Sequence, residues 1–154
     1  MRVCPRTDRS VYRRMAKMIR DTLRDGRERG APLCLLGDGR IVMGREVVGD
    51  SHEVTIPACD AGVTIGLFHT HTSGMPIPSR EDLEALLYSD LKVTCIGEPN
   101  SGGVWCYVPK GPREAEELRS MLESGDINTD EVLSRMWYTV FNPRDMRKFG
   151  FLKY

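Results

Sequence analysis

Residues 63–88 read VTIGLFHTHTSGMPIPSREDLEALLY, and this stretch has three parts. An apolar run comes first, a loop rich in glycine and proline follows, and a segment with helical spacing ends it. The apolar run predicts a strand that ends at His69 and His71, and Asp82 stands in the first turn of a helix predicted from about Arg80 to Tyr88. Side chains two residues apart on a strand share one face and lie about 6 to 7 Å apart. Both imidazoles can therefore reach one ion, and Asp82 can join them if the loop folds back.

Two imidazoles and one carboxylate are the protein ligands of many catalytic zinc sites, in which water takes the fourth position. The sequence therefore predicts a zinc site made of His69, His71 and Asp82. The same residues also have simpler interpretations. Two histidines on one strand face are often ordinary exposed side chains, and Ser79 with Asp82 matches a helix capping box.

Taken together, these residues resemble the signature of the JAMM/MPN+ metalloproteases. That signature is His-(Ser/Thr)-His, seven residues, Ser, two residues and Asp, and the chain has His69-Thr-His71, Ser79 and Asp82 at these spacings. It departs from the family at Thr72, where members commonly carry proline. The resemblance covers about residues 10–110 and implies an α/β (α+β) fold, a curved mixed β-sheet flanked by helices that is similar to cytidine deaminases.

The resemblance also implies an activity. Members of this family are zinc-dependent proteases, and the implied reaction is hydrolysis of the peptide or isopeptide bond that follows a ubiquitin-like protein. The ubiquitin-like protein or its conjugate would be the partner of this chain, and Zn²⁺ would be its cofactor. Ser79 would donate a hydrogen bond to the developing oxyanion, and a glutamate would act as general base.

The general base is where the chain departs most from the family. There a Glu opens a strand of the form Glu-x-x-Gly-x-Leu-x-Gly, seven residues before the final glycine. Aligning that glycine with Gly37 places Gly30 at the catalytic position, while Glu28 lies two residues earlier. A shift of two residues keeps the strand face but moves the side chain by about 6.6 Å, so a bulge near Gly30 would be needed. We take Glu28 as the base because family order places it before the hairpin; Glu46 on the return strand and Glu53 are the alternatives.

Two other functional classes stay open at this point. The first is a scaffold or interaction module, with or without bound metal, that catalyses nothing. The second is a metallohydrolase that acts on a different amide, because the short segment before the His69 strand leaves little room for a substrate-grasping insertion.

Composition limits the remaining possibilities. A chain of 154 residues predicts one domain, and it is too short for a barrel of about 250 residues. No run of about 18 apolar residues and no secretory signal is present, so we expect a cytoplasmic protein without a membrane span. The formal net charge is zero and no aromatic residues alternate with the basic ones, which argues against nucleic-acid binding. A homo-oligomer is left open.

The five cysteines are odd in number and scattered, and most lie in or near apolar runs. We therefore expect Cys34, Cys59, Cys95 and Cys106 to be unpaired core residues in a reducing compartment.

Periodicity and turn residues predict the other elements. A loose arm at 1–9 precedes a helix from Ser10 to Asp25, and Gly37-Asp38-Gly39 turns the chain between two strands. The remaining expected elements are strands at 32–36, 40–48, 53–56, 92–97 and 104–108, a helix from 111, and a final helix over 132–140. Residues 111–154 are thus expected to form a helical C-terminal part whose placement the sequence does not give.

Overall fold

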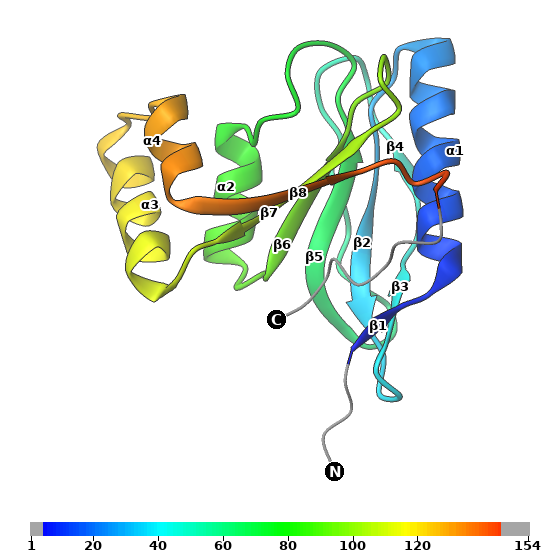
Figure 1. The fold of residues 1–154 in the computed structure, drawn as a ribbon, viewed down its shortest axis with the longest axis horizontal. Coiled ribbons are helices and arrows are strands. Elements are labelled where there is room, and N and C mark those ends of the chain that lie inside the picture. Colours follow the sequence, from blue (N-terminus) through cyan, green and yellow to red (C-terminus); the bar gives the residue numbers. More distant parts are fainter. Residues whose placement is uncertain (1–4, 146–154) are drawn as a thin grey trace.

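The computed structural model describes residues 5–145, in which one mixed β-sheet curls into a half-barrel with helices on both faces (Figure 1). The elements in chain order are β1 (Arg6–Thr7), α1 (Arg9–Asp25), β2 (Arg29–Leu35), β3 (Arg40–Met43), β4 (Val47–Val48), β5 (Val63–Thr70), α2 (Arg80–Tyr88), β6 (Val93–Gly97), β7 (Val104–Pro109), α3 (Pro112–Ser124), α4 (Thr129–Ser134) and β8 (Met136–Phe141). The predicted α/β class with a curved mixed sheet is therefore confirmed.

The strand order is β1-β3-β2-β5-β6-β7-β8, and β4 pairs with the start of β2. β5 and β6 are parallel neighbours, whereas β2–β5, β6–β7 and β7–β8 are antiparallel. Parallel neighbours need a crossover connection, and α2 with its preceding loop supplies it. The loop before α2 therefore starts at the C-terminal end of the central strand β5, and α2 then leads the chain back to the start of β6.

One core lies between α1 and the sheet. Asp8 caps this helix by accepting a hydrogen bond from the Ser10 N–H, and Gly26 ends it in the left-handed conformation at φ 69°. The buried face of the helix packs on side chains of β2, β3 and β5, which include Leu33, Ile41 and Phe68.

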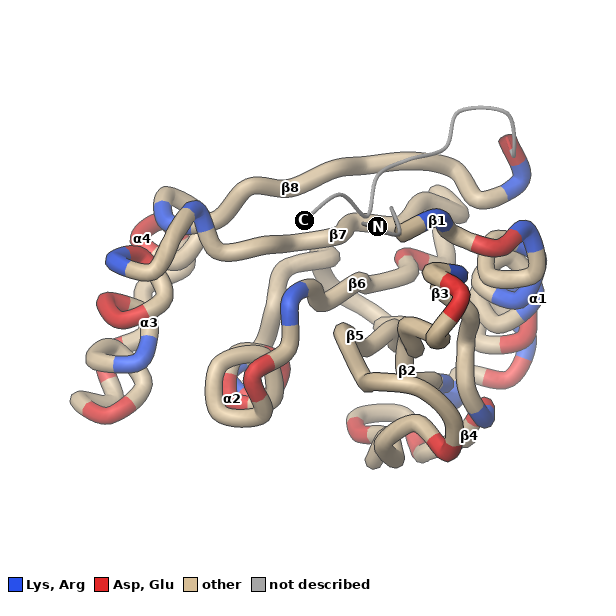
Figure 2. The backbone as a smooth tube through the Cα atoms, turned by 90° about the horizontal axis from the view of Figure 1, so that it is seen from below, with Lys and Arg blue, Asp and Glu red and all other residues tan. Residues whose placement is uncertain are grey.

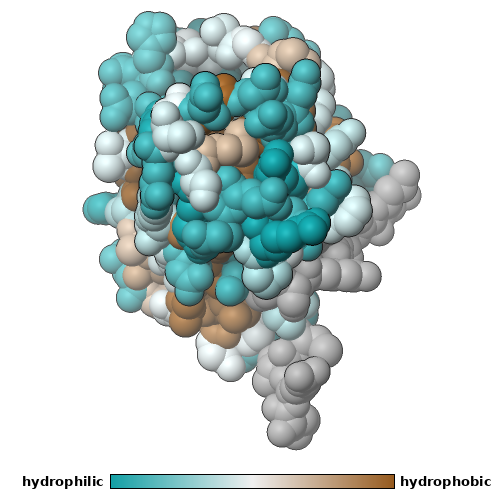
Figure 3. Space-filling model, turned by 90° about the vertical axis from the view of Figure 1, so that its left-hand side faces the viewer, coloured by the Kyte–Doolittle hydropathy of each residue, from teal (hydrophilic) through white to brown (hydrophobic). Residues whose placement is uncertain are grey.

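A second core lies on the opposite face of the sheet, between α2, α3 and strands β6 and β7. Its central residues are Leu83, Leu86, Ile96 and Leu118, each with at most 1% of its surface exposed. The outward face over α3 and α4 is mainly hydrophilic (Figure 3). Basic residues gather on α1, while acidic residues of α2 and α3 lie across the sheet from it (Figure 2).

The prediction of a final helix over 132–140 is wrong. α4 ends at Ser134, and Met136–Phe141 forms β8 instead. The sequence of β8 is rich in aromatic and β-branched residues, and it pairs along the whole of β7. Pairing satisfies backbone groups of β7 that would otherwise face an open sheet edge, and this outweighs the helical spacing of the apolar residues. The C-terminal part is thus only partly helical, and residues 146–154 lie outside the described residues.

The expectation of unpaired cysteines is also wrong for all four residues that it named. Disulfides join Cys34 to Cys59 and Cys95 to Cys106, while Cys4 lies outside the described residues. Cys95 and Cys106 face each other in the β6–β7 register, which no spacing rule reveals in a single sequence. Disulfides are typical of oxidising compartments, so cysteine usage does not support a cytoplasmic location, which stays a prediction.

Three smaller expectations need correction. The return strand expected over 40–48 is split into β3 and β4, and the arm at 1–9 contributes β1, which pairs with β3. The short strand expected at 53–56 does not form. Residues 49–62 contain no helix or strand and are called here the irregular segment. Within the described residues, no helix is long and apolar enough to cross a membrane.

Candidate metal centre

Three potential metal ligands converge where β5 ends and α2 begins. His69 is next to last in β5, His71 follows that strand, and Asp82 is the third residue of α2. Asp82 Oδ1 lies 3.3 Å from His69 Nε2, and Asp82 Oδ2 lies 3.8 Å from His71 Nε2. All three ligand atoms lie within 4.8 Å of one another. Tetrahedral zinc with bonds of about 2.0–2.2 Å separates its ligand atoms by about 3.4 Å, so this group could hold a metal ion with small adjustments.

The helix start fixes the carboxylate of Asp82. The Ser79 side chain accepts a hydrogen bond from the Asp82 N–H at 3.2 Å, and Asp82 Oδ2 accepts one from the Ser79 N–H at 2.8 Å. These two bonds form a complete capping box, which is the alternative to a metal-binding role for Ser79 and Asp82. The two interpretations are compatible, because the same bonds that cap α2 aim the Asp82 carboxylate at the two imidazoles.

The electrostatic environment favours the cation-binding forms of His69 and Asp82. Burial lowers the pKa of His69, which keeps this imidazole neutral near pH 7. Burial opposes ionisation of Asp82, but His69, His71 and the Ser79 N–H together hold the pKa of this carboxyl below its usual range. His71 is also desolvated, yet its hydrogen bond and charge interaction with Asp82 raise its pKa. A proton and a metal ion would therefore compete for His71.

Glu28 lies beside these ligands. The β2–β5 register pairs Gly30 with His69, and extending it by two residues brings Glu28 level with His71 on the same face of the sheet. The backbone of Glu28 is fixed by two bonds: its N–H donates to Asp50 O at 2.7 Å, and its carbonyl accepts from Gly49 N at 2.8 Å. The residue is 9% exposed. Burial raises the pKa of its carboxyl, and the charges of His71 and Asp82 act on it in opposite directions.

The bulge expected near Gly30 is not there. The register of β2 against β5 shifts between Leu33 and Cys34 instead, and the pairing of the two strands ends at Gly30 and His69, two residues from Glu28. Gly30 is the position at which the family alignment expects a glutamate, and a Cβ atom there would meet the Ile56 side chain at 2.6 Å. The irregular segment thus occupies the space that a side chain at position 30 would need.

Glu28, Ser79 and the three potential ligands line one cavity of about 420 Å³. Glu53 also lines it, whereas Glu46 does not. The pKa of Arg29 is raised most by its hydrogen bond to Asp25, and the charge of Glu46 adds to this increase. The sequence analysis did not place the other lining residues at the site: His52, Val54, Ile56, Leu67, Glu81 and Ala85. His52 is exposed although it lines the cavity. Three of the six, His52, Val54 and Ile56, belong to the irregular segment, which carries no periodic pattern that could have located it.

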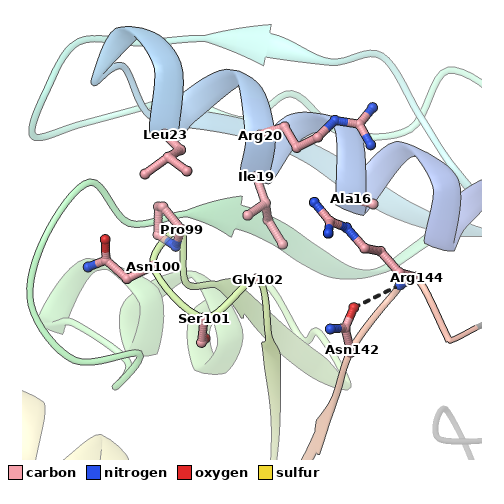
Figure 4. A pocket seen from close by; sticks show the side chains of 10 residues that line it. All are labelled: Ala16, Ile19, Arg20, Leu23, Pro99, Asn100, Ser101, Gly102, Asn142 and Arg144. Atoms are coloured by element: carbon pink, nitrogen blue, oxygen red, sulfur yellow. Dashed lines mark hydrogen bonds between the residues drawn. The ribbon is translucent and has the colours of Figure 1, made fainter.

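A second cavity of about 190 Å³ lies on the other face of the sheet, against α1 (Figure 4). The β6–β7 turn closes one side of it, and Asn142 accepts a hydrogen bond from the Arg144 N–H at another. The residues that line it include Arg20 and Arg144 but no histidine, cysteine or carboxylate. It therefore offers none of the side chains that usually bind zinc.

A comparison with models of known protein families gave no match, and a comparison with curated proteins gave none either.

Proposed function

We propose that this chain is a zinc-dependent hydrolase of amide bonds, in which His69, His71 and Asp82 hold the ion. One observation supports this most: a buried carboxylate, Glu28, lies level with the ligands in the cavity that they line. Three protein ligands with an open cavity in front of them are the arrangement of catalytic rather than structural zinc sites.

When bound, zinc lowers the pKa of a coordinated water to about 7 and polarises the scissile carbonyl. Glu28 accepts the proton of the attacking water and returns it to the leaving amine. Burial suits this role, because it raises the pKa of the Glu28 carboxyl toward the working range of a general base. The Ser79 hydroxyl lines the cavity and donates a hydrogen bond to the oxyanion, while its oxygen accepts from the Asp82 N–H.

The substrate we propose is the peptide or isopeptide bond after a ubiquitin-like protein. Support comes from the spacing of His69, His71, Ser79 and Asp82, which resembles the JAMM/MPN+ signature. A smaller amide is the second candidate. It is favoured by the irregular segment, which crosses the cavity with Ile56 packed near Gly30 and Cys59 tied to β2 by a disulfide.

Zinc content and hydrolysis, measured on the same preparations, test the proposal. Wild-type protein should carry one zinc per chain, and His71→Ala should lose it while circular dichroism shows the fold intact. Glu28→Gln should keep the zinc and lose nearly all turnover on a panel of ubiquitin-like fusions and small amides. Glu46→Gln is the matched control and should keep both, because Glu46 lies outside the cavity.

The outcomes separate the functional classes. Full zinc retention in His71→Ala refutes the ligand assignment, and equal turnover in Glu28→Gln and Glu46→Gln refutes the assigned base. Zinc-loaded wild type that hydrolyses no member of the panel indicates a metal-binding module without catalysis.

A further inference from the structure

We infer that Tyr107, on a strand that carries no metal ligand, is a positioning residue that sets the metal affinity of this centre. The inference rests on the metal site of the proposed function. It concerns the ligand loop, residues 72–78, which joins His71 to Ser79. The conformation of this loop determines how the His71 imidazole is placed relative to Asp82 on α2.

The ligand loop has few means of holding its own shape. Two of its residues, Pro76 and Pro78, have no N–H to donate, and Met75 at its tip is 71% exposed. Within the loop, the Ile77 N–H donates to Met75 O at 2.8 Å. The loop is anchored from outside at two points: Thr72 Oγ1 donates to Ser51 O at 2.7 Å, and the Tyr107 hydroxyl donates to Pro76 O at 2.6 Å.

Strand register brings Tyr107 to this position. Leu67, Thr94 and Tyr107 pair in sequence across β5, β6 and β7, so Tyr107 stands on the face of the sheet that carries His69. Its side chain is 3% exposed and belongs to the core beneath α2 and α3. Burial raises the pKa of Tyr107 to about 12, so the hydroxyl remains a donor at all physiological pH values. A buried side chain therefore holds a loop whose tip, residues 73–75, is exposed.

The anchored residue adjoins the group that orients His71. His71 Nδ1 lies 3.3 Å from Met75 O, and Met75 directly precedes Pro76. A proton on Nδ1 donates to this carbonyl and leaves Nε2 free for a metal ion. By fixing Pro76 O, Tyr107 fixes the peptide next to the carbonyl that holds the imidazole in the ligating orientation. Loss of the hydroxyl releases the carbonyl and lets the His71 ring turn.

Tyr107→Phe is the test, because it removes the hydroxyl and keeps the ring. Tyr138→Phe is a matched control: its ring lies 5.9 Å from that of Tyr107, and its side chain is 62% exposed. For each variant, the Zn²⁺ dissociation constant is measured by competition with a chelator, the visible spectrum is recorded with Co²⁺ bound, and the melting temperature is taken without metal. Loss of a group that supports a metal ligand typically weakens metal binding by about 10- to 100-fold.

We expect Tyr107→Phe to bind Zn²⁺ about tenfold or more weakly and to change the Co²⁺ spectrum, while Tyr138→Phe matches the wild type. Unchanged affinity and spectrum in Tyr107→Phe overturn the inference, even if the metal-free variant melts earlier, because that result shows a purely structural bond. A wild type that takes up no metal overturns both this inference and the proposed function. A wild type that binds Zn²⁺ but hydrolyses nothing counts against the proposed function alone, since the loss of affinity would still support the role of Tyr107.

Discussion

Replacing Thr70 by valine should destabilise the protein, although the two side chains have nearly the same shape. Thr70 stands between His69 and His71 and is fully buried. Its Oγ1 accepts a hydrogen bond from the Arg29 N–H at 2.9 Å and lies 2.7 Å from Thr22 Oγ1. The Thr22 hydroxyl can also donate to Arg27 O at 2.9 Å and the Thr70 hydroxyl to Arg29 O at 3.5 Å, so either threonine can be the donor of the pair. One side chain thus links α1, the start of β2 and the end of β5.

The magnitude follows from what valine leaves behind. The Arg29 N–H loses its acceptor in a buried site, which costs about 1–3 kcal/mol, and the loss of the threonine pair removes about 1 kcal/mol more. No cavity forms, since the volume of the side chain hardly changes. The free energy of unfolding should therefore fall by about 2–4 kcal/mol, and the β2–β5 register that brings Glu28 level with His71 should loosen.

Urea unfolding of the metal-free protein measures this change, and an unaltered denaturant slope would show that the unfolded state is the same. Thr70→Ser serves as control because it keeps the hydroxyl and loses one methyl group. The serine variant should therefore be clearly more stable than the valine variant. If Thr70→Val unfolds within about 0.5 kcal/mol of the wild type, the buried network contributes nothing and the reasoning is wrong.

Two further predictions concern the helix cap and the irregular segment. Ser79→Ala removes the oxygen that caps α2 and should lower the free energy of unfolding by about 1 kcal/mol. Under the proposed function it should also lower turnover about 10²–10³-fold at unchanged zinc content. Stopped assays and metal analysis on one preparation measure both quantities. Normal turnover in a merely less stable variant would reduce Ser79 to a cap. Cys59→Ser removes the Cys34–Cys59 disulfide, whose sequence separation is 25 residues. A loop of that length corresponds to about 3.5 kcal/mol of stabilisation by chain entropy. Denaturant unfolding measures the loss, and a change below about 1 kcal/mol would contradict the pairing.

The elements that the sequence predicted well are those that local residues determine. Asp25 and Gly26 end α1 as expected, and the predicted bounds of α2, Arg80–Tyr88, match the structure. Both helices carry their own start and stop signals in the chain. β8 was mistaken for a helix because its identity depends on the free edge of β7, a partner that no local pattern shows. The disulfide of Cys95 and Cys106 likewise depends on a register between strands.

The grouping of the three potential metal ligands was predictable for a related reason. His69 and His71 share a strand face by simple alternation, and the capping box fixes Asp82 at the start of the next helix. The only long-range condition is that the loop between them folds back, which the crossover from β5 to α2 enforces. Of the remaining lining residues, His52, Val54 and Ile56 come from the irregular segment, whose placement depends on contacts with Glu28, Gly30 and β2 that only the folded chain defines.

The general base shows where reasoning from motif spacing ends. A spacing rule counts residues along one strand, whereas the distance from a carboxylate to the metal depends on how β2 is set against β5. Gly30 faces His69 directly, yet the Ile56 side chain fills the space that a side chain at Gly30 would take. The next position on the same face is Glu28, held in line by its bonds to Gly49 and Asp50. The irregular segment therefore both fills the space beside Gly30 and holds the backbone of Glu28, so the proposed identity of the base depends on that segment as much as on the strand.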